Sequence, residues 1–100
     1  MRPVLVADLL YAGRALLAAP PEQGMRRALT LLGDAERADR HRQATGQRHP
    51  VFGDGTLAAA AQAGGLAPER VLCDPEFARA LIVVLQALVG HCDETDRVRR

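Results

Sequence analysis

The residues best suited to chemistry in this chain lie in one stretch, ERADRHRQATGQRHPVFGDGT, between positions 36 and 56. It gathers arginines, carboxylates and two histidines between segments that consist largely of leucine and alanine. Basic side chains in a row could contact phosphate groups or an acidic partner protein. The candidate interaction surface predicted from this stretch comprises Arg37, Arg40, His41, Arg48, His49 and Phe52.

The same stretch also fits the solvated face of a helix. Glu36 and Arg40 are spaced i,i+4, and Asp39 and Arg42 are spaced i,i+3, so both can form compensated surface pairs. Such pairs are common and contribute little to stability. Acids interrupt the basic row, and three aromatic residues in the whole chain leave little for base stacking. The sequence leaves both interpretations open.

Metal binding has less support from the same residues. His41 and His49 could be ligands together with Asp39 or Asp54. Di-iron bundles need Glu-x-x-His on two helices, but here an aspartate stands three positions after Glu36 and no second half-site exists. We therefore expect no metal and no cofactor, and we expect His49 to fix the loop.

No pattern of a catalytic nucleophile is present. The chain has no serine, and its threonines lack flanking motifs. Cys73 precedes Asp74, whose negative charge disfavours a thiolate. The GDG at 53–55 is a turn, because a phosphate cradle needs a preceding strand and further glycines. The sequence predicts a protein that is not an enzyme.

Length and composition favour one small globular domain over residues 1–100. Hydrophobic residues make up 48% and charged residues 25%, with a net charge of +1, which argues against disorder and against a polyanion partner. All 13 basic residues are arginine, and lysine, serine and asparagine are absent, as expected of a GC-rich, bacterial coding sequence.

The expected location is the cytoplasm. Asp8, Gly13 and Arg14 interrupt the apolar N-terminus, so it lacks the unbroken apolar region of an export signal and reads as mature protein. No uninterrupted apolar run approaches the length of a membrane span. Cys73 and Cys92 match neither a disulfide framework nor a zinc pattern, so we expect reduced thiols.

The elements that must position these residues are helices. Asp8 is predicted to cap a first helix ending near Ala18, with an inward face formed by Leu9, Ala12, Gly13, Leu16 and Leu17. Pro20 and Pro21 separate it from a second helix over about 22–44, closed by Gly46. Met25, Ala28, Leu29, Leu32 and Ala35 are predicted to face inward, and the polar second half to run out into water.

After the loop, two more helices are predicted. Asp54 or Thr56 can cap a slim alanine-rich helix that ends at Gly64 and Gly65 and serves as a packing spacer. Asp74 and Pro75 begin the last helix, which is apolar nearly all round and is therefore either central or in contact with another chain. The tail 93–100 either frays or extends this helix, with Asp93 spaced to pair with Arg97 and Asp96 with Arg100.

The predicted fold is an all-α small bundle of four to five helices with a buried, central C-terminal helix. The first two helices are expected to form a hairpin across the proline pair. Phe52 is expected to insert between the second and last helices, because transfer of a phenylalanine side chain out of water is favourable and the chain has only three aromatic residues.

Several segments together resemble a group of small uncharacterised bacterial proteins of unknown function. The segments are RPVL, ADRHR, HPVFGDGTL, DPEFARAL and VLQAL, and they span nearly the whole chain. The resemblance implies a complete single domain and transfers no catalytic or binding residue. It makes HPVFGDGTL the most distinctive segment.

Two functions remain as expectations. The first is a non-enzymatic interaction module, an adaptor or accessory subunit that forms homo-oligomers or docks on a larger bacterial assembly. The alternative is a nucleic-acid-associated protein that contacts phosphates through Arg37, Arg40, His41 and Arg48. No membrane partner is expected.

Overall fold

A computed structural model describes the backbone of residues 1–99 and the side chains of residues 1–93, and it contains four α-helices. They are α1 (Val6–Leu17), α2 (Gly24–Thr45), α3 (Leu57–Ala63) and α4 (Pro75–Arg99). One turn of 3₁₀ helix, Pro21–Gln23, precedes α2. Among the described residues the only extended pairing is an isolated bridge between His49 and Gly53. The all-α small bundle is confirmed.

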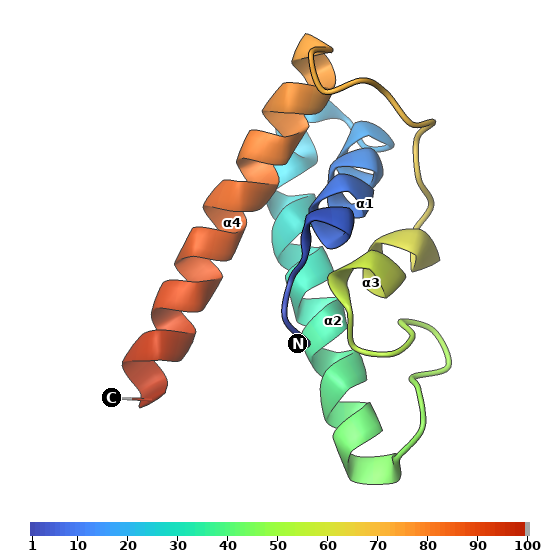
Figure 1. Cartoon of the computed structure of the whole chain (residues 1–100), viewed down its shortest axis with the longest axis vertical. Coiled ribbons are helices and arrows are strands. Elements are labelled where there is room, and N and C mark those ends of the chain that lie inside the picture. Colours follow the sequence, from blue (N-terminus) through green and yellow to red (C-terminus); the bar gives the residue numbers. More distant parts are fainter. Residues whose placement is uncertain (100) are drawn as a thin grey trace.

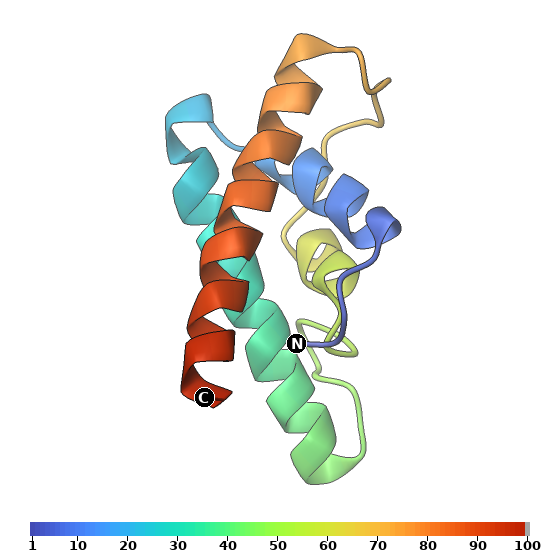
Figure 2. The same cartoon turned by 60° about the vertical axis from the view of Figure 1, so that its left-hand side comes forward.

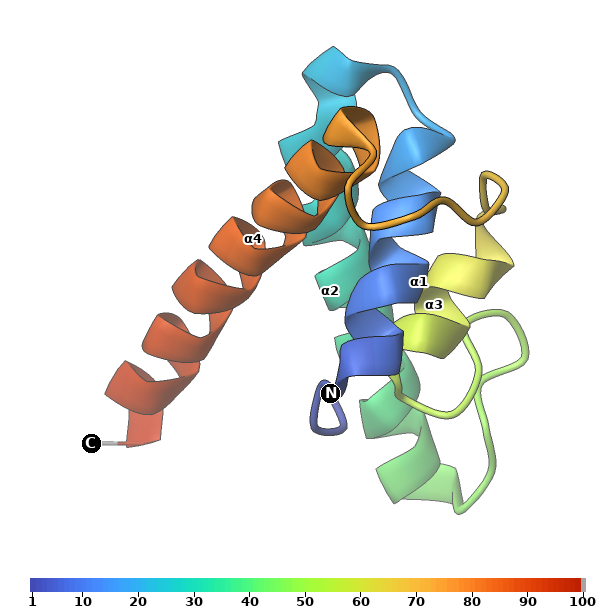
Figure 3. The ribbon, with the colours of Figure 1, turned by 45° about the horizontal axis from the view of Figure 1, so that its top comes forward.

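The hairpin of α1 and α2 is the centre of the molecule. The two helices run in opposite directions on either side of the proline pair, as predicted, and α3 and α4 cover opposite sides of the hairpin (Figure 1). Figure 3 shows the same order from another side, with α1 between α4 and α3. α1 contacts the three other helices.

The prediction of a central, buried C-terminal helix is wrong. One side of α4 packs against α1 and α2, and its other side faces away from the bundle (Figure 2). Ile82, Leu85 and Val89 are 53%, 47% and 61% exposed. α4 carries more apolar residues than its contacts with α1 and α2 can bury. The second interpretation from the sequence, that this helix contacts another chain, therefore remains.

The core consists of small residues around a few large ones. Phe77, Leu31 and Leu57 are the largest side chains that are fully buried. Gly13 allows α1 to approach α4 closely, because a Cβ atom there would lie 2.6 Å from Leu81 Cδ2 and 3.0 Å from Phe77 Cε1. Alanines 60 and 61 of α3 are buried as well, which confirms that this helix packs closely through small residues.

The inward face of α2 differs from the predicted one. Met25 and Leu29 are exposed, whereas Leu31, which the sequence pattern did not select, is 1% exposed. Nor does the second half of the helix leave the core at once, because Ala38 and Asp39 are buried. The N-terminal segment and the loop 46–56 cover this part of α2. The spacing of apolar residues within one helix does not reveal such contacts with distant segments.

Asp8 is not the cap residue of α1. The cap position is Leu5, and Asp8 is the third residue of the helix. Its Oδ2 accepts the N–H of Leu5 at 2.8 Å, and its Oδ1 accepts the N–H of Ala58, in the first turn of α3, at 3.0 Å. This buried carboxylate therefore joins the N-termini of two helices.

The other predicted helix ends are confirmed. Gly46 closes α2 with φ of 75°, in the left-handed region. Thr56 Oγ1 accepts the N–H of Ala59 at 3.2 Å, and Asp74 Oδ1 accepts the N–H groups of Glu76 and Phe77. The tail extends α4 as far as Arg99, while the predicted pairs of Asp93 with Arg97 and of Asp96 with Arg100 lie outside the described side chains.

Candidate functional site

Four of the six predicted surface residues form one cluster where α2 meets the loop 46–56. The ring of His49 stacks on that of Phe52, with centroids 5.0 Å apart, and meets the ring of His41 edge-on at 5.2 Å. The guanidinium carbon of Arg37 lies 5.6 Å from the centroid of Phe52. Phe52 is half-buried in these contacts. It does not insert between α2 and α4, so that prediction is wrong.

His49 organises the loop, as the sequence predicted. Its backbone exchanges hydrogen bonds with Gly53, the N–H of His49 donating at 2.7 Å and the N–H of Gly53 at 3.1 Å. Its Nδ1 accepts the N–H groups of Val51 at 3.0 Å and Phe52 at 3.1 Å. An Nδ1 that accepts two hydrogen bonds carries no proton of its own. The imidazole therefore has a local structural role in the turn.

The two remaining residues of the predicted surface lie elsewhere. Arg40 lines a groove on the α4 side of α2, together with Leu88 and His91. Arg48 lines a different hollow, formed by the loop and α3. The six residues therefore form a cluster of four and two separate arginines, and no continuous basic ridge exists along α2.

Acidic neighbours compensate two arginines of α2. Arg37 donates to Asp34, and Arg42 donates to Asp39 at 2.8 Å, which confirms the predicted pair. Glu36 does not pair with Arg40 as predicted. It accepts instead from the ammonium group of Met1 at 2.8 Å, and it lies 3.0 Å from Nε2 of His91 on α4. Both partners of Glu36 are remote in sequence, and the i,i+4 spacing therefore predicted the wrong partner, Arg40.

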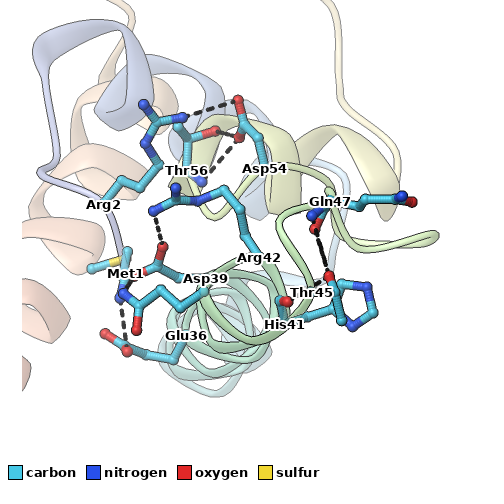
Figure 4. A network of polar contacts seen from close by, with 11 residues as sticks. Met1, Arg2, Glu36, Asp39, His41, Arg42, Thr45, Gln47, Asp54 and Thr56 are labelled. Atoms are coloured by element: carbon cyan, nitrogen blue, oxygen red, sulfur yellow. Dashed lines mark hydrogen bonds and ion pairs between the residues drawn. The ribbon is translucent and has the colours of Figure 1, made fainter.

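The N-terminal ammonium group is the centre of a polar network on α2 (Figure 4). Besides Glu36, it contacts Asp39 at 3.2 Å, and the side chain of Met1 is 6% exposed. On the loop, Asp54 Oδ1 accepts the N–H and the hydroxyl of Thr56, and Asp54 Oδ2 lies 3.7 Å from the Arg2 guanidinium. The first two residues thereby bridge α2 and the loop before α3.

The network lowers the pKa of three carboxyl groups. Partial burial acts to raise the pKa of Glu36, but hydrogen bonds with the Met1 ammonium group and His91 outweigh it, so the pKa lies below the ordinary 4.5. The hydrogen bond from Arg42 lowers the pKa of Asp39, and the hydroxyl of Thr56 lowers that of Asp54, both below 3.8. The folded chain therefore favours their ionised forms.

Next to this network lies an open groove of about 1040 Å³ between the N-terminal segment, α2 and the second half of α4. Its polar end contains Glu36, Asp39 and His91. Its apolar lining comes from the start of the chain and from α4, namely Val4, Leu5, Val6, Leu9, Leu85 and Leu88, and Arg2, Arg40 and Gln43 line it as well. Leu5 and Val6 are 69% and 73% exposed. We call this surface, together with Ile82 and Val89 on the same side of α4, the α1–α4 apolar surface.

The α1–α4 apolar surface is not among the sites predicted from the sequence. The signal was present in the last helix, whose apolar stripe is too wide for one contact face. The contribution of Leu5 and Val6 could not be found in this way, because it depends on where the N-terminal segment lies relative to α4.

Within residues 1–93 no group of three histidine, cysteine, aspartate or glutamate side chains is placed to hold a metal ion. Cys73 and Cys92 are both exposed and unbonded to each other. The carboxylates of the network accept hydrogen bonds from fixed partners of the fold, and most of the side chains that line the groove beside them are apolar.

Comparison with known proteins gives a family and no activity. Residues 2–88 match the model of a family described as a domain of unknown function, DUF7742, and the chain belongs to this family. No curated protein and no solved structure is similar enough to be matched.

Proposed function

Because membership of a family of unknown function assigns no activity, we propose from the surface of the molecule that this chain is a non-enzymatic protein-interaction module. The observation that carries the proposal is the α1–α4 apolar surface. Leu5, Val6, Ile82, Leu85 and Val89 are all 47% exposed or more, and they come from the beginning of α1 with its cap residue and from the neighbouring α4. Soluble monomers rarely leave large apolar side chains gathered in this way, and such patches mark contact sites.

The proposed setting is an adaptor or accessory subunit in the bacterial cytoplasm that forms homo-oligomers or docks on a larger assembly. Support for this setting comes from composition, because a chain whose basic residues are all arginine and which lacks lysine, serine and asparagine suits a GC-rich genome. The two exposed, unpaired cysteines suit a reducing compartment.

Pro75–Asp93, within α4, is long and apolar enough to cross a membrane by length and composition. A core helix of a soluble protein passes the same test, and Phe77, Ala80, Val84 and Ala87 of this helix are buried against the bundle. The contacts of α4 with α1 and α2 therefore favour a protein partner for its outer face over lipid around its whole circumference.

The nucleic-acid alternative has weaker support. Arg37 and Arg42 are paired with buried aspartates, and Arg40 and Arg48 lie on different hollows. A phosphate-binding surface would need several free cations on one face. A DNA or RNA mobility shift at low salt that is lost as salt rises would favour this alternative.

The experiment that tests the proposal is co-purification from the native host with a matched pair of variants. Leu85→Glu places a charge on the α1–α4 apolar surface, whereas Val51→Glu places one on the exposed loop 46–56. We expect specific partners, including untagged copies of the chain, to be retained by the parent and by Val51→Glu and lost from Leu85→Glu. If the same proteins accompany all three, the surface is not a docking site and the proposal fails.

A further inference from the structure

We propose that the partner of the outer face of α4 is a second copy of this chain, whose own α4 packs against it in antiparallel orientation. The inference rests on the proposed function, because it assigns a partner to part of the α1–α4 apolar surface. It is carried by the arrangement of side chains along α4.

The exposed residues of α4 follow a heptad pattern. Ala78, Ile82, Leu85, Val89 and Cys92 are spaced four, three, four and three residues apart, the alternation of a and d positions in a coiled coil. Ala78 is half-buried, and the four residues after it in the stripe are exposed, so the stripe faces outward from Ile82 to Cys92. The inward-facing residues, such as Phe77 and Val84, lie on a different side of the helix. The seam is therefore additional to the contact of α4 with its own bundle.

The rows beside this stripe differ from each other. On one side stand Arg79, Gln86 and Asp93, each seven residues after the last and all exposed, which are the e positions. On the other side stand the g positions, Leu81 and Leu88, which are partly buried. Leu81 packs against α1 at Gly13. Only the e row can meet a second helix with polar side chains.

The e row is complementary to itself in one orientation. In an antiparallel pair with a two-fold axis near Leu85 and Gln86, the e row of one copy faces the e row of the other in reverse order. Arg79 of each copy then meets Asp93 of the other, and the two Gln86 side chains meet at the centre. A parallel pair would instead set the e row against Leu81 and Leu88, which already belong to the bundle.

The apolar contacts obey the same symmetry. In an antiparallel pair the a positions of one helix face the d positions of the other, so Leu85 of each copy lies opposite Val89 of the other on either side of the axis, and Ile82 lies opposite Cys92. Because Leu85 also lines the groove with Leu5 and Val6, a helix seated on the stripe covers part of the N-terminal segment as well. The contact therefore extends beyond the two heptads between Ala78 and Cys92, which would form a weak coiled coil alone.

The test is a charge exchange across the proposed axis, with dimer dissociation constants measured by sedimentation or light scattering. Arg79→Glu alone sets two acids against each other at both ends of the contact, and Asp93→Arg alone sets two arginines against each other. We expect each single variant to dimerise about tenfold more weakly than the parent. Mixed in equal amounts, the two chains restore opposite charges at both ends, so the heterodimer should recover the affinity of the parent.

Helicity by circular dichroism serves as the control, because both positions are exposed and the monomers should keep their fold. A mixture that associates no better than its components overturns the antiparallel arrangement. If the parent is strictly monomeric and binds a different protein that Leu85→Glu no longer binds, the inference of a second copy is overturned and the proposed function stands. A monomeric parent that binds vesicles of phosphatidylcholine through α4 assigns the stripe to lipid and also overturns the inference.

Discussion

The two sides of the α1–α2 hairpin are built from different kinds of contact. On the α3 side, small buried residues and hydrogen bonds close the structure, from the Asp8 carboxylate that joins α1 to α3 to the turn held by His49. On the α4 side, large apolar residues pack inward at Phe77 and Val84 but are 47% and 61% exposed at Leu85 and Val89. The α3 side buries its small residues within one chain and leaves only isolated apolar side chains such as Val51 exposed, whereas the α4 side has a continuous apolar surface that one chain does not cover.

Among substitutions on the two faces of α4, the largest loss of stability is expected at Phe77, on the inner face. Its side chain is 2% exposed, and Phe77→Ala would leave a cavity between α1 and α4. We expect a loss of about 3–5 kcal/mol in the free energy of unfolding, measured by urea denaturation. Val89→Glu, on the outer face of the same helix, should leave the stability of the monomer nearly unchanged. Equal losses in the two variants would contradict the distinction between the faces.

On the α3 side, Asp8→Asn should break the junction of two helices. An asparagine has one acceptor oxygen where the carboxylate accepts from both Leu5 and Ala58, and its NH₂ group would face an N–H donor. We expect a loss of about 1–3 kcal/mol in unfolding free energy. Hydrogen exchange should show faster opening at the start of α3. Unchanged protection of the Ala58 amide would show that the carboxylate does not hold this junction.

Acid should weaken the polar network before it affects the apolar contacts of α4. The pKa values of Glu36, Asp39 and Asp54 are lowered in the folded chain, so their contribution to stability is full above the ordinary values of 4.5 and 3.8. It is lost as pH falls through the lower folded values. Urea midpoints measured between pH 7 and about 2 should therefore stay level and then decline below about pH 4.5. Glu36→Gln should reduce the part of the decline that begins at the highest pH.

The smallest of these effects on stability is expected for Phe52. Its ring is half-buried and contacts His49 and Arg37 at the surface, so Phe52→Ala should cost about 1 kcal/mol, well below the value for Phe77. Thermal unfolding of the two alanine variants gives the comparison directly. A loss as large as that of Phe77→Ala would place Phe52 in the core.

The features that could be predicted from the sequence are those decided by near neighbours in the chain. The left-handed Gly46, the Thr56 cap and the Asp74 cap are set within three or four residues, and so is the turn around His49. The contacts that could not be predicted join distant segments. Asp8 with Ala58 and Glu36 with His91 depend on how the helices pack, and short-range spacing suggested other partners for both carboxylates.

The same reason explains the candidate site. The stretch 36–56 has the most varied side chains, but the fold divides its arginines between separate surfaces and uses its histidines in local packing. The sequence does indicate the apolar stripe of α4, because the last helix has more apolar positions than one contact face needs. Its position on the outside of the bundle required knowing that α1, a short helix, occupies the centre.

The most direct measurement is the mass of the chain in solution by sedimentation equilibrium, for the parent, Val89→Glu and Val51→Glu. The two valines are equally exposed, at 61%, but only Val89 lies on the α1–α4 apolar surface. The parent and Val51→Glu should reach twice the mass of 10.7 kDa as concentration rises, and Val89→Glu should remain at the mass of one chain. A parent that stays monomeric, or a Val89→Glu chain that associates as well as Val51→Glu, would contradict the association of two copies through this surface.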